Sequence, residues 1–386
     1  MVGGGPAGAM AASLLSAAGH KTCLFEEKLA WEKPCGGGLT HKALARFPFL
    51  ADAEVERNWV EGCELISPSG RRAWFFLDQP IAIFSRLVLN RLLLDRAENA
   101  GAEIVRERVI GIDGRPGAWS LRTSERERQA NYVILAGGAR NSLRVQFCRP
   151  LAPADLMATF GYYIPLTGNS MQIKFPRGLE GYIWIFPRRD HLSAGICGKL
   201  NGRSTAELRR MLDNFLQQQG IEFAGAEVYA HLLPAPQHET LRQLRLQGPG
   251  WAMVGDTAGL VDPITGEGLY YALRSAELLA QALISGRPQR YTESVRQDFL
   301  PELETAARYA DRFYSGQFLG GAVLDRMVQF TARSARVRRL MCDVFSGAQS
   351  YVGLRRRAYV TFLSALAEVA FNNDARASLD LWRTPA

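Results

Sequence analysis

The first 26 residues, MVGGGPAGAMAASLLSAAGHKTCLFE (Met1 to Glu26), decide the fold. A Gly-x-Gly-x-x-Gly spacing is followed by an alanine-rich stretch typical of a helix and by a short apolar strand that ends in an acid. Such glycines let a backbone approach a pyrophosphate, the helix N-terminus favours its charge, and the acid accepts from a ribose hydroxyl. The stretch therefore predicts a Rossmann-like dinucleotide-binding unit. The expected contact residues are Gly3, Gly5, Pro6, Ala7, Gly8, Glu26 and Glu27.

The strand before the first glycine is unusually short. Only Met1 and Val2 precede it, whereas a typical strand has about five or six residues. We therefore expect either a misplaced start or a trimmed N-terminus, and native upstream residues should then raise cofactor occupancy.

Composition indicates an ordinary globular protein. The 386 residues are enough for two or three units of roughly 150 residues each. Apolar residues make up 47% of the chain, but no run of about 18 of them occurs, so we expect no transmembrane helix. The six cysteines contain no C-x-x-C pair and the five histidines show no ligand spacing. We expect no metal site and no disulfide framework, which fits a reducing cytoplasm.

The net charge of +8 lies largely in two late stretches, ARSARVRRL (332–340) and LRRRA (354–358). No aromatic platform or groove-reading motif accompanies them, so we expect no nucleic-acid partner. A solvated helix face and attraction to anionic lipid both remain open. On one helix, Arg333, Arg336 and Arg339 would share a face and Arg338 would lie off it. The apolar surface beside them would come from Met327, Val328, Phe330, Leu340 and Val344; in the alternative, the arginines pair with Asp325 and Asp343.

Alternating and helical patterns place the other elements. Residues 60–84 read as two strands around a Ser-Gly turn, and residues 86–103 as a helix that ends at a glycine. A helix is expected at about 204–219, a strand that breaks at Gly255-Asp256, another helix at 266–286, and helices from about 290 to the end. The expected class is α/β (α+β): a Rossmann-like domain (1–59, 85–150, 245–290) interleaved with an antiparallel β-sheet substrate domain (60–84, 151–244), plus a helical C-terminal region (291–386).

Four motifs in sequence order, GGGPAG, PCGGGL, ILAGGARNSLR and GDTAGLVDPITGEGLYYAL, carry a family resemblance over roughly residues 1–290. The chain resembles the FAD-dependent geranylgeranyl reductases, which share the para-hydroxybenzoate hydroxylase-like fold. Asn90 and the Gly137-Gly138 pair stand where related proteins commonly have aspartate. The resemblance implies FAD binding by Arg86, Gly255, Asp256, Gly266 and Gly268; a surface salt bridge is the alternative for Arg86.

The resemblance also assigns a place to PCGGGL, which would lie along the flavin ring. Cys35, Gly36 and Gly37 would then contact the cofactor, with bare backbone leaving the space open. Cys35 would donate a proton or tune the ring. A cysteine that is merely packed, in a flexible surface turn, is the alternative.

The stretch GYIWIFPRRDHLSAGICG (181–198) contains alternating Tyr182, Trp184 and Phe186, which share one face of a strand. Such a face is either core or the wall of a substrate cavity. A similar Y-x-W-x-F-P element lines the cavity in the resembled reductases, and flavin-dependent halogenases have a comparable W-x-W-x-I-P element. Tyr182 and Trp184 are therefore expected, with Cys35, at the catalytic site.

The resemblance implies reduction of carbon–carbon double bonds in a prenyl chain by hydride from reduced flavin. Electrons would come from NAD(P)H or ferredoxin, bound transiently. The expected place is the cytoplasm, with peripheral contact at the inner face of the membrane. Two other functions remain open: an FAD-dependent monooxygenase or halogenase acting on an aromatic substrate, and a non-catalytic flavoprotein or lipid-binding protein.

Overall fold

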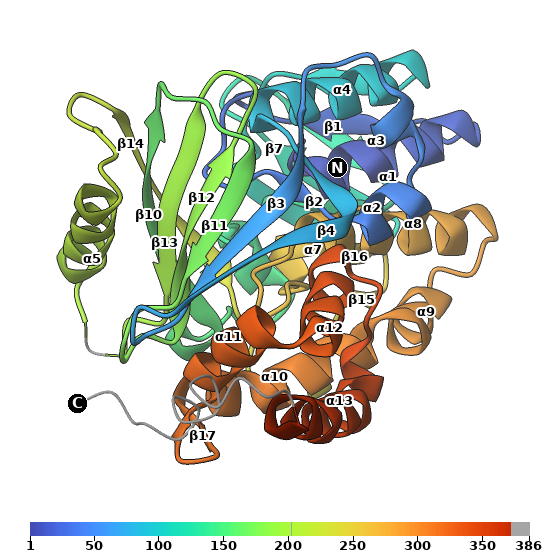
Figure 1. The fold of residues 1–386 in the computed structure, drawn as a ribbon. Helices are drawn as coiled ribbons and strands as arrows, with labels where there is room; N and C mark the ends of the chain where they lie inside the picture. The colour runs from blue at the N-terminus through green and yellow to red at the C-terminus, as the bar shows by residue number, and fades with distance from the viewer. Residues whose placement is uncertain (202, 372–386) are drawn as a thin grey trace. The chain divides into compact units, whose positions relative to one another are not determined.

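The computed structural model describes residues 1–201 and 203–371. The chain forms two compact units, and each is assembled from separate stretches of sequence (Figure 1). The mixed α/β class and the interleaving of a parallel-sheet part with a second sheet are as predicted. Unit 1 comprises Met1–Lys33, Ser85–Leu156 and Leu232–Ala307, and unit 2 comprises Pro34–Phe84, Met157–His231 and the described residues from Arg308 on.

The unit bounds differ from the expected domain bounds at residues 34–59, at residues 151–156 and 232–244, which belong to unit 1, and in the C-terminal region. Residues 34–59 belong to unit 2, because β2 (Gly38–Leu39) pairs with β4 (Arg72–Ile83) of the second sheet. The C-terminal helices form no separate part, since residues up to 307 belong to unit 1 and later ones to unit 2.

Unit 1 is built on a mainly parallel sheet. The residues before the first glycine lie in its middle, where Val2 bridges in parallel to Phe25 on one side and to Leu135 on the other. Beyond them lie two pairs of short parallel strands and one antiparallel edge strand. These strands are β1 Cys23–Phe25 with β5 Glu103–Val105, β9 Val133–Leu135 with β16 Trp251–Met253, and the edge strand β15 Gln247–Gly248.

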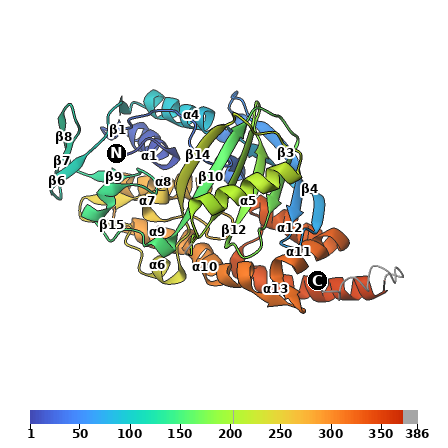
Figure 2. The same cartoon turned by 90° about the vertical axis from the view of Figure 1, so that its left-hand side faces the viewer.

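Helix α1 (Pro6–Ala17) is almost entirely buried, because it packs against both α4 (Arg86–Asn99) and α8 (Leu269–Ile284). Its alanines permit that close approach, whereas larger side chains would hold the helices apart. A separate antiparallel sheet of unit 1 consists of β6 Gly111–Arg115, β7 Ala118–Arg122 and β8 Glu127–Ala130 (Figure 2). The remaining helices of unit 1 are α6 His238–Arg242, α7 Gly255–Ala258, α9 Arg290–Asp298 and the first half of α10 Leu300–Ser315. Two 3-10 turns lie at Ser142–Gln146 and Pro153–Asp155.

Unit 2 is built on an eight-stranded sheet in the order β14-β10-β13-β12-β11-β3-β4-β2. The pairing of β11 with β3 is parallel, so this sheet is not purely antiparallel as expected. The predicted strand pair at 60–84 is present as β3 and β4, joined at a Ser67–Gly70 turn. The remaining strand bounds are β3 Asn58–Ile66, β10 Leu156–Ile164, β11 Ser170–Lys174, β12 Gly181–Pro187, β13 Leu192–Gly198 and β14 Glu227–Pro234.

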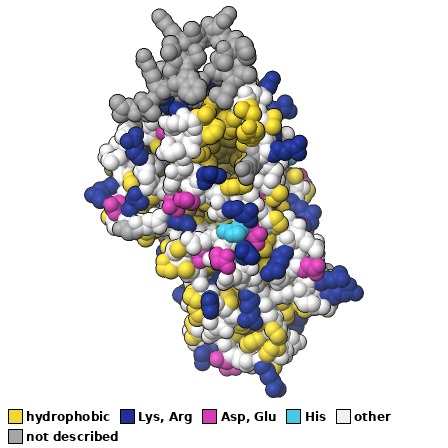
Figure 3. All heavy atoms as spheres, turned by 90° about the horizontal axis from the view of Figure 1, so that it is seen from below, with side chains coloured by type: hydrophobic (Ala, Val, Ile, Leu, Met, Phe, Trp, Pro, Cys, Tyr) yellow, Lys and Arg dark blue, Asp and Glu magenta, His cyan; other side chains and the backbone are white. Residues whose placement is uncertain are grey.

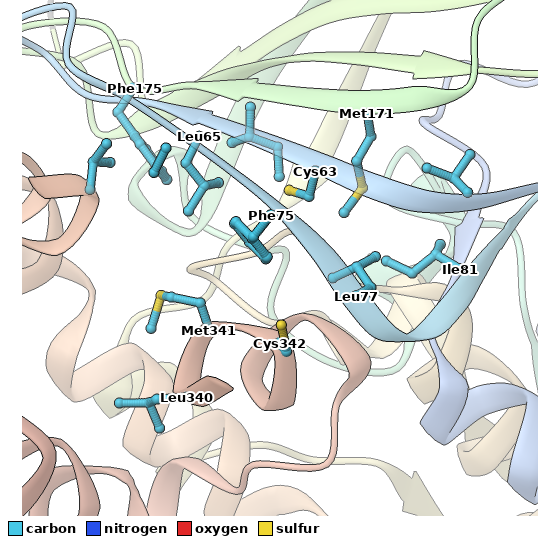
Figure 4. Packing of buried hydrophobic residues seen from close by; sticks show 14 of the residues in the cluster. Cys63, Leu65, Phe75, Leu77, Ile81, Met171, Phe175, Leu340, Met341 and Cys342 are labelled. Atoms are coloured by element: carbon cyan, nitrogen blue, oxygen red, sulfur yellow. The ribbon is translucent and has the colours of Figure 1, made fainter. Parts of the chain in front are cut away.

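The two faces of this sheet bury different hydrophobic clusters. Helix α5 (Thr205–Gln218) covers one face, where Leu208 and Leu212 are fully buried against residues of β10, β12 and β13. Helices α11 (Val323–Arg333) and α12 (Ala335–Ser346) cover the other face at β4. Figure 4 shows Phe75, Cys63 and Met171 on that second face, turned toward Met341 and Cys342 of α12.

Two of the cysteines in this second cluster are buried thiols. Burial raises the pKa of Cys63 well above its ordinary value, and it also raises the pKa of Cys342. The thiol of Cys342 contacts the carbonyl oxygen of Phe76 at 3.1 Å.

Several other predicted elements are confirmed. The helices expected at 86–103, 204–219 and 266–286 are α4, α5 and α8, each slightly shorter than expected. The C-terminal part is helical through α13 (Tyr351–Phe371), apart from a small hairpin of β17 (Gln317–Phe318) and β18 (Gly321–Ala322). Short helices α2 (His41–Arg46) and α3 (Phe49–Asp52) complete unit 2. Among the described residues, no helix combines the length and the apolar character needed to cross a bilayer.

Candidate functional site

The glycine-rich turn before α1 is shaped by close approaches of the backbone. A Cβ on Gly3, which has φ +105°, would lie 2.5 Å from the carbonyl oxygen of Ala136. A Cβ on Gly8 would lie 1.9 Å from the carbonyl oxygen of Gly3, whereas a Cβ on Gly5 would meet nothing within 4 Å. Packing of the turn therefore requires Gly3 and Gly8, and the bare backbone at Gly5 faces open space.

The N-terminus of α1 opens beside that space. Gly5 is the N-cap and Pro6 is the first helical residue, and no side chain caps the helix. The first backbone N–H groups of a helix have no intrahelical acceptor, and the helix dipole adds positive potential there. The turn thus offers donors to an anionic group such as a pyrophosphate.

Glu26 directly follows β1 and folds back onto the turn. Its Oε2 accepts a hydrogen bond from the Gly4 N–H at 2.8 Å, and its Oε1 accepts one from the Lys28 N–H at 3.1 Å. A Cβ on Gly4 would lie 2.7 Å from the Glu26 Cβ, so the carboxylate sits directly against the glycine backbone. Glu27, the other acid chosen from the sequence, is exposed.

The GDTAG motif meets the glycine turn within unit 1. Gly255 adopts φ +57° and donates its N–H to the buried Ser275 hydroxyl at 3.0 Å. A Cβ there would lie 3.1 Å from the Ala7 Cβ, so α7 packs on the first turn of α1. Asp256 lies next to the N-terminus of α8, since a Cβ on Gly268 would be 3.2 Å from its Oδ1. The structure therefore brings the first and last sequence motifs together.

Lys33, which was not among the expected binding residues, is a neighbour of Asp256. Its Nζ lies 3.4 Å from the Asp256 Oδ2, and both side chains are about one-fifth exposed at 19%. A Cβ on Gly138 would lie 3.7 Å from the same Nζ, and the Gly138 carbonyl accepts from the Thr257 hydroxyl at 3.1 Å. A cation therefore stands where the loop after β9 meets α7. The position of Lys33 directly before the PCGGGL motif was the sequence feature that could have identified it as a candidate.

Arg86, at the start of α4, is buried, so the surface salt bridge considered for it is wrong. Its Nη2 donates to the Asn90 Oδ1 at 3.2 Å, while its buried Nε has no hydrogen-bond partner among the described residues. The Glu32 carboxylate accepts from the Arg86 backbone N–H at 2.8 Å and from the Ser85 hydroxyl, and thereby caps α4. A buried donor without a partner is costly unless a ligand supplies the acceptor.

Unit 2 contains the second group of predicted residues, beginning with Cys35. This cysteine is half-buried, and its Sγ accepts a hydrogen bond from the Gly37 N–H at 3.3 Å. Its carbonyl oxygen accepts from the Arg188 Nη2 at 2.6 Å and from the Ser193 hydroxyl at 3.0 Å. The loop is thus tied to β12 and β13, so the flexible surface turn considered for it is wrong.

The glycines of this loop are explained by packing. A Cβ on Gly36 would lie 2.6 Å from the ring of Phe186. Gly37 has φ +84°, and a Cβ there would lie 2.1 Å from the carbonyl oxygen of Phe84, whose own N–H donates to the Gly37 carbonyl at 2.9 Å. Gly38 has only ordinary contacts, the nearest at 3.5 Å. Two of the three glycines therefore make room for neighbours in unit 2 itself.

Tyr182, Trp184 and Phe186 lie on one face of β12, as predicted. Tyr182 and Phe186 are half-buried and pack against the cluster beneath α11 and α12. Trp184 is only 6% exposed, and its indole lies over Gly195, where a Cβ would be 2.3 Å from the ring. Tyr182 and Phe186 therefore retain surface that a ligand could contact, while Trp184 is largely a packing residue in this structure.

Sequence reasoning missed the polar residues beneath the Cys35 loop. Ser193 contacts the Trp184 Nε1 at 3.4 Å and the Tyr229 hydroxyl at 3.2 Å, besides the Cys35 carbonyl. Burial raises the pKa of Tyr229, so its hydroxyl stays protonated. Arg188 is fully buried. The only sequence feature that pointed to Arg188 was the Arg188-Arg189 pair after Pro187, and this pair does not show which arginine is buried.

The triple glycine provides a direct test of this packing. We expect Gly36→Ala to lower the free energy of unfolding by about 1–3 kcal/mol, because the added methyl group forces the Phe186 ring to move. Gly38→Ala is the matched control, since its Cβ would make only ordinary contacts. Urea unfolding of both variants measures the difference, and equal stability of the two would contradict the packing account.

Comparison with known proteins points to one cofactor. The profile of the FAD-dependent oxidoreductase family (DAO) matches residues 39–274. A geranylgeranyl diphosphate reductase from Synechocystis is 28% identical over 89% of this chain and 88% of its own length. A solved geranylgeranyl bacteriochlorophyll reductase-like protein from Thermoplasma acidophilum covers 93% of this chain and 98% of its own at a TM-score of 0.76 and 22% identity. A solved flavin-dependent brominase, Bmp2, covers 94% of this chain and 98% of its own at a lower TM-score of 0.66 and 16% identity.

The residues of unit 1 suit FAD on their own chemistry. The open backbone at Gly5 and the uncapped start of α1 provide donors for phosphate oxygens, and the unpartnered Nε of Arg86 is a further buried donor. Glu26 and Asp256 supply acceptors for hydroxyl groups. Since the matching profile spans more than half of the chain, this protein belongs to the FAD-dependent oxidoreductase family.

Proposed function

We propose that this oxidoreductase reduces carbon–carbon double bonds of a prenyl chain. The main support is similarity along nearly the whole length to a protein named geranylgeranyl diphosphate reductase, together with the Cys35 loop and the aromatic face of β12. The decisive experiment reduces the purified protein with dithionite under anaerobic conditions and supplies geranylgeranyl diphosphate. Mass spectrometry should find products heavier by two hydrogen atoms per double bond. Unchanged substrate, with flavin bound and reduced, would contradict the proposal.

The cofactor would be held by unit 1. The N-terminus of α1, Lys33 and Arg86 provide positive potential and donors for the diphosphate, and Glu26 and Asp256 accept from hydroxyl groups. Lys33 also places a positive charge beside Asp256, which offsets the negative charge that this carboxylate would bring close to phosphate. When bound and reduced, FAD supplies a hydride to one alkene carbon.

Cys35 would supply the proton that the other alkene carbon needs, so that hydride and proton together add two hydrogen atoms. Its Sγ accepts from the Gly37 N–H, a contact that stabilises the thiolate left after proton transfer. Chain connectivity also favours this role, because Cys35 follows only two residues after Lys33, which contacts Asp256. Two peptide units span at most about 7 Å.

Tyr182 and Phe186 would supply apolar surface for the prenyl chain. An isolated alkene is a poor electrophile, so reaction requires close and lasting approach in a site without water. The half-buried rings of these two residues exclude water without offering competing charge. Trp184 would act by holding this face rigid through its contacts with Gly195 and Ser193.

The second candidate is an oxygen-using monooxygenase or halogenase, and the fold shared with a flavin-dependent brominase favours it. Its products would require oxygen, whereas alkene reduction proceeds without it. Product analysis in air and under nitrogen, with reduced flavin in both, separates the two chemistries. Turnover with NAD(P)H or reduced ferredoxin would show which donor supplies electrons; we propose that either binds transiently.

Contact with anionic membrane is also proposed, but with a different apolar surface from the one the sequence suggested. Ser334 separates α11 from α12, so Arg333 lies on another helix than Arg336 and Arg339. Val328, Phe330 and Leu340 are buried in the core, and expecting them to meet lipid was wrong. Asp343 pairs with Arg357, and Asp325 accepts a hydrogen bond from the Ser69 N–H at 3.0 Å. Arg336 and Arg339 are exposed to solvent.

Helix α13 provides the apolar surface instead. Val352, Tyr359 and Leu363 are 62%, 67% and 49% exposed, and their spacing of i, i+7 and i+11 puts them on one face. Arg356, at i+4, adds a positive charge on the same face and is exposed. Figure 3 shows many Lys and Arg side chains on one face of the protein, with several Asp and Glu side chains between them. The positive charges favour anionic lipid by about 1 kcal/mol each near the surface.

Replacement of Cys35 tests its proposed role. We expect Cys35→Ser to lower the rate of alkene reduction by about 100-fold, in line with the loss of a general acid, while FAD content stays near that of the unchanged protein. Cys148→Ser is the control, because Cys148 is also a half-buried free cysteine but lies in unit 1. Anaerobic single-turnover reoxidation of the flavin by substrate measures the rate. A parallel loss of FAD, or no loss of rate, would make Cys35 structural.

The two adjacent acids after β1 make separable predictions for cofactor affinity. Glu26→Gln removes a charged acceptor from the glycine turn, and we expect FAD to bind about tenfold more weakly. The same change at the exposed Glu27 should alter the affinity less than about twofold. Fluorescence titration of the apoprotein with FAD measures both. A larger effect at Glu27 would reverse the assignment.

Membrane contact predicts binding that depends on lipid charge and on α13. The protein should sediment with anionic phosphatidylglycerol vesicles but not with neutral phosphatidylcholine vesicles, and added salt should weaken binding because it screens the arginines. Tyr359→Ser with Leu363→Ser, or Arg336→Gln with Arg339→Gln, should each reduce binding severalfold. Val228→Ser, at a 52% exposed apolar residue of β14, is the control. Equal binding to both kinds of vesicle would end the proposal.

A further inference from the structure

We infer that Arg188 is a positioning residue: together with Ser193 it clamps the carbonyl group of Cys35 and so fixes how the Cys35–Gly36 peptide and the thiol are presented. The inference rests on the proposed function in treating Cys35 as a reacting residue. All of the groups involved lie in unit 2.

The clamp consists of two donors on a single acceptor. Arg188 directly follows Pro187, the last residue of β12, and turns inward to 0% exposure. Its Nη2 lies 2.6 Å from the Cys35 carbonyl oxygen, and the Ser193 Oγ of β13 lies 3.0 Å from the same oxygen. A carbonyl oxygen has two lone pairs, so these two donors fill its capacity. The contact with the guanidinium is charge-assisted and therefore among the stronger hydrogen bonds.

Other contacts hold the guanidinium itself. Its Nη1 lies 3.3 Å from the His191 Nε2, and the His191 Nδ1 lies 2.7 Å from a carboxylate oxygen of Asp190. The tautomer that donates from Nδ1 to Asp190 leaves Nε2 as the acceptor for Arg188. The guanidinium also lies 5.2 Å from the ring centroid of Tyr163, within the range of a cation–π contact. Since burying a guanidinium is costly, its support by His191 and Tyr163, in addition to the Cys35 carbonyl, indicates a specific task.

The clamp sets the direction of the next donor along the chain. The peptide bonds of the described residues are trans, so the N–H of Gly36 points opposite to the Cys35 carbonyl. With the carbonyl held against Arg188 and Ser193, this N–H points away from them. No described residue accepts a hydrogen bond from it. The loop therefore presents a preset donor beside the thiol, suited to an acceptor atom of a bound molecule.

The glycines that follow Cys35 make the orientation of the Cys35–Gly36 peptide dependent on the clamp. Gly36 and Gly37 impose little torsional restriction, so a glycine-rich loop could otherwise rotate its peptide planes easily. Phe186 restricts Gly36 on the side where a Cβ would project, since that Cβ would meet the Phe186 ring. Ser193 further links the clamp to the Trp184 indole. Ser193 thus contacts both the Cys35 loop and the aromatic face of β12.

Hydrogen exchange tests the clamp in the FAD-bound protein without substrate. In Arg188→Met, the amides of residues 35–38 and of Phe84, which donates to the Gly37 carbonyl, should exchange at least threefold faster than in the unchanged protein. Ser193→Ala should give a smaller increase in the same segment. Arg189→Met is the matched control, because Arg189 is adjacent but exposed, and its exchange should match that of the unchanged protein.

Kinetic measurements then distinguish a positioning role of Arg188 from a purely structural one. Arg188→Met should lower kcat for alkene reduction at least tenfold at an unchanged KM and FAD content, and Arg188→Lys should restore part of the loss, since lysine keeps one charged donor. Unchanged exchange at residues 35–38 in both Arg188→Met and Ser193→Ala overturns the inference. If Arg188→Met unfolds, Ser193→Ala decides by the same exchange measurement. An active Cys35→Ser variant would instead contradict the proposed function, while the exchange result would still stand.

Discussion

Four backbone hydrogen bonds made by the first three residues hold unit 1 together. Val2 donates to the Ile134 carbonyl at 2.9 Å and accepts from the Ala136 N–H at 2.8 Å, while Met1 and Gly3 bond on the other side to Phe25. These contacts join two separate pairs of short parallel strands into one sheet. They also fix where the chain leaves the sheet, and so where Gly3 turns and α1 begins. Every donor expected at the glycine turn depends on this three-residue strand.

The sequence predicted the parts of the site that are local in the chain. The glycine spacing followed by Glu26 describes a turn whose contacts lie within about 26 residues, and the structure shows Glu26 bonded to Gly4. The alternation at 60–84 and the helix ends were predictable for the same reason. The resemblance implied that Gly255 and the glycine turn bind the same cofactor, but no local pattern predicted that Gly255 would pack against Ala7.

Other contacts were not predictable because they join distant residues or depend on a single backbone break. Arg188 reaches the carbonyl of Cys35 across 153 positions, and a pair of arginines after a strand does not reveal which one is buried. The glycines of PCGGGL were expected to leave room for a ligand, yet Gly36 and Gly37 make room for Phe186 and Phe84. A helical face drawn through Arg333 and Arg336 failed because Ser334 ends one helix and caps the next.

The two buried thiols of the unit 2 cluster affect how well the protein resists oxidation by peroxide. Reduced flavins react with oxygen to give peroxide, and peroxide attacks thiolates far faster than thiols. Burial keeps Cys63 and Cys342 protonated and away from solvent, so these two side chains resist that attack. The half-buried Cys35 has no comparable cover. If Cys35 donates the proton as proposed, oxidation of its thiol would remove activity while the sheet and its helices stay folded.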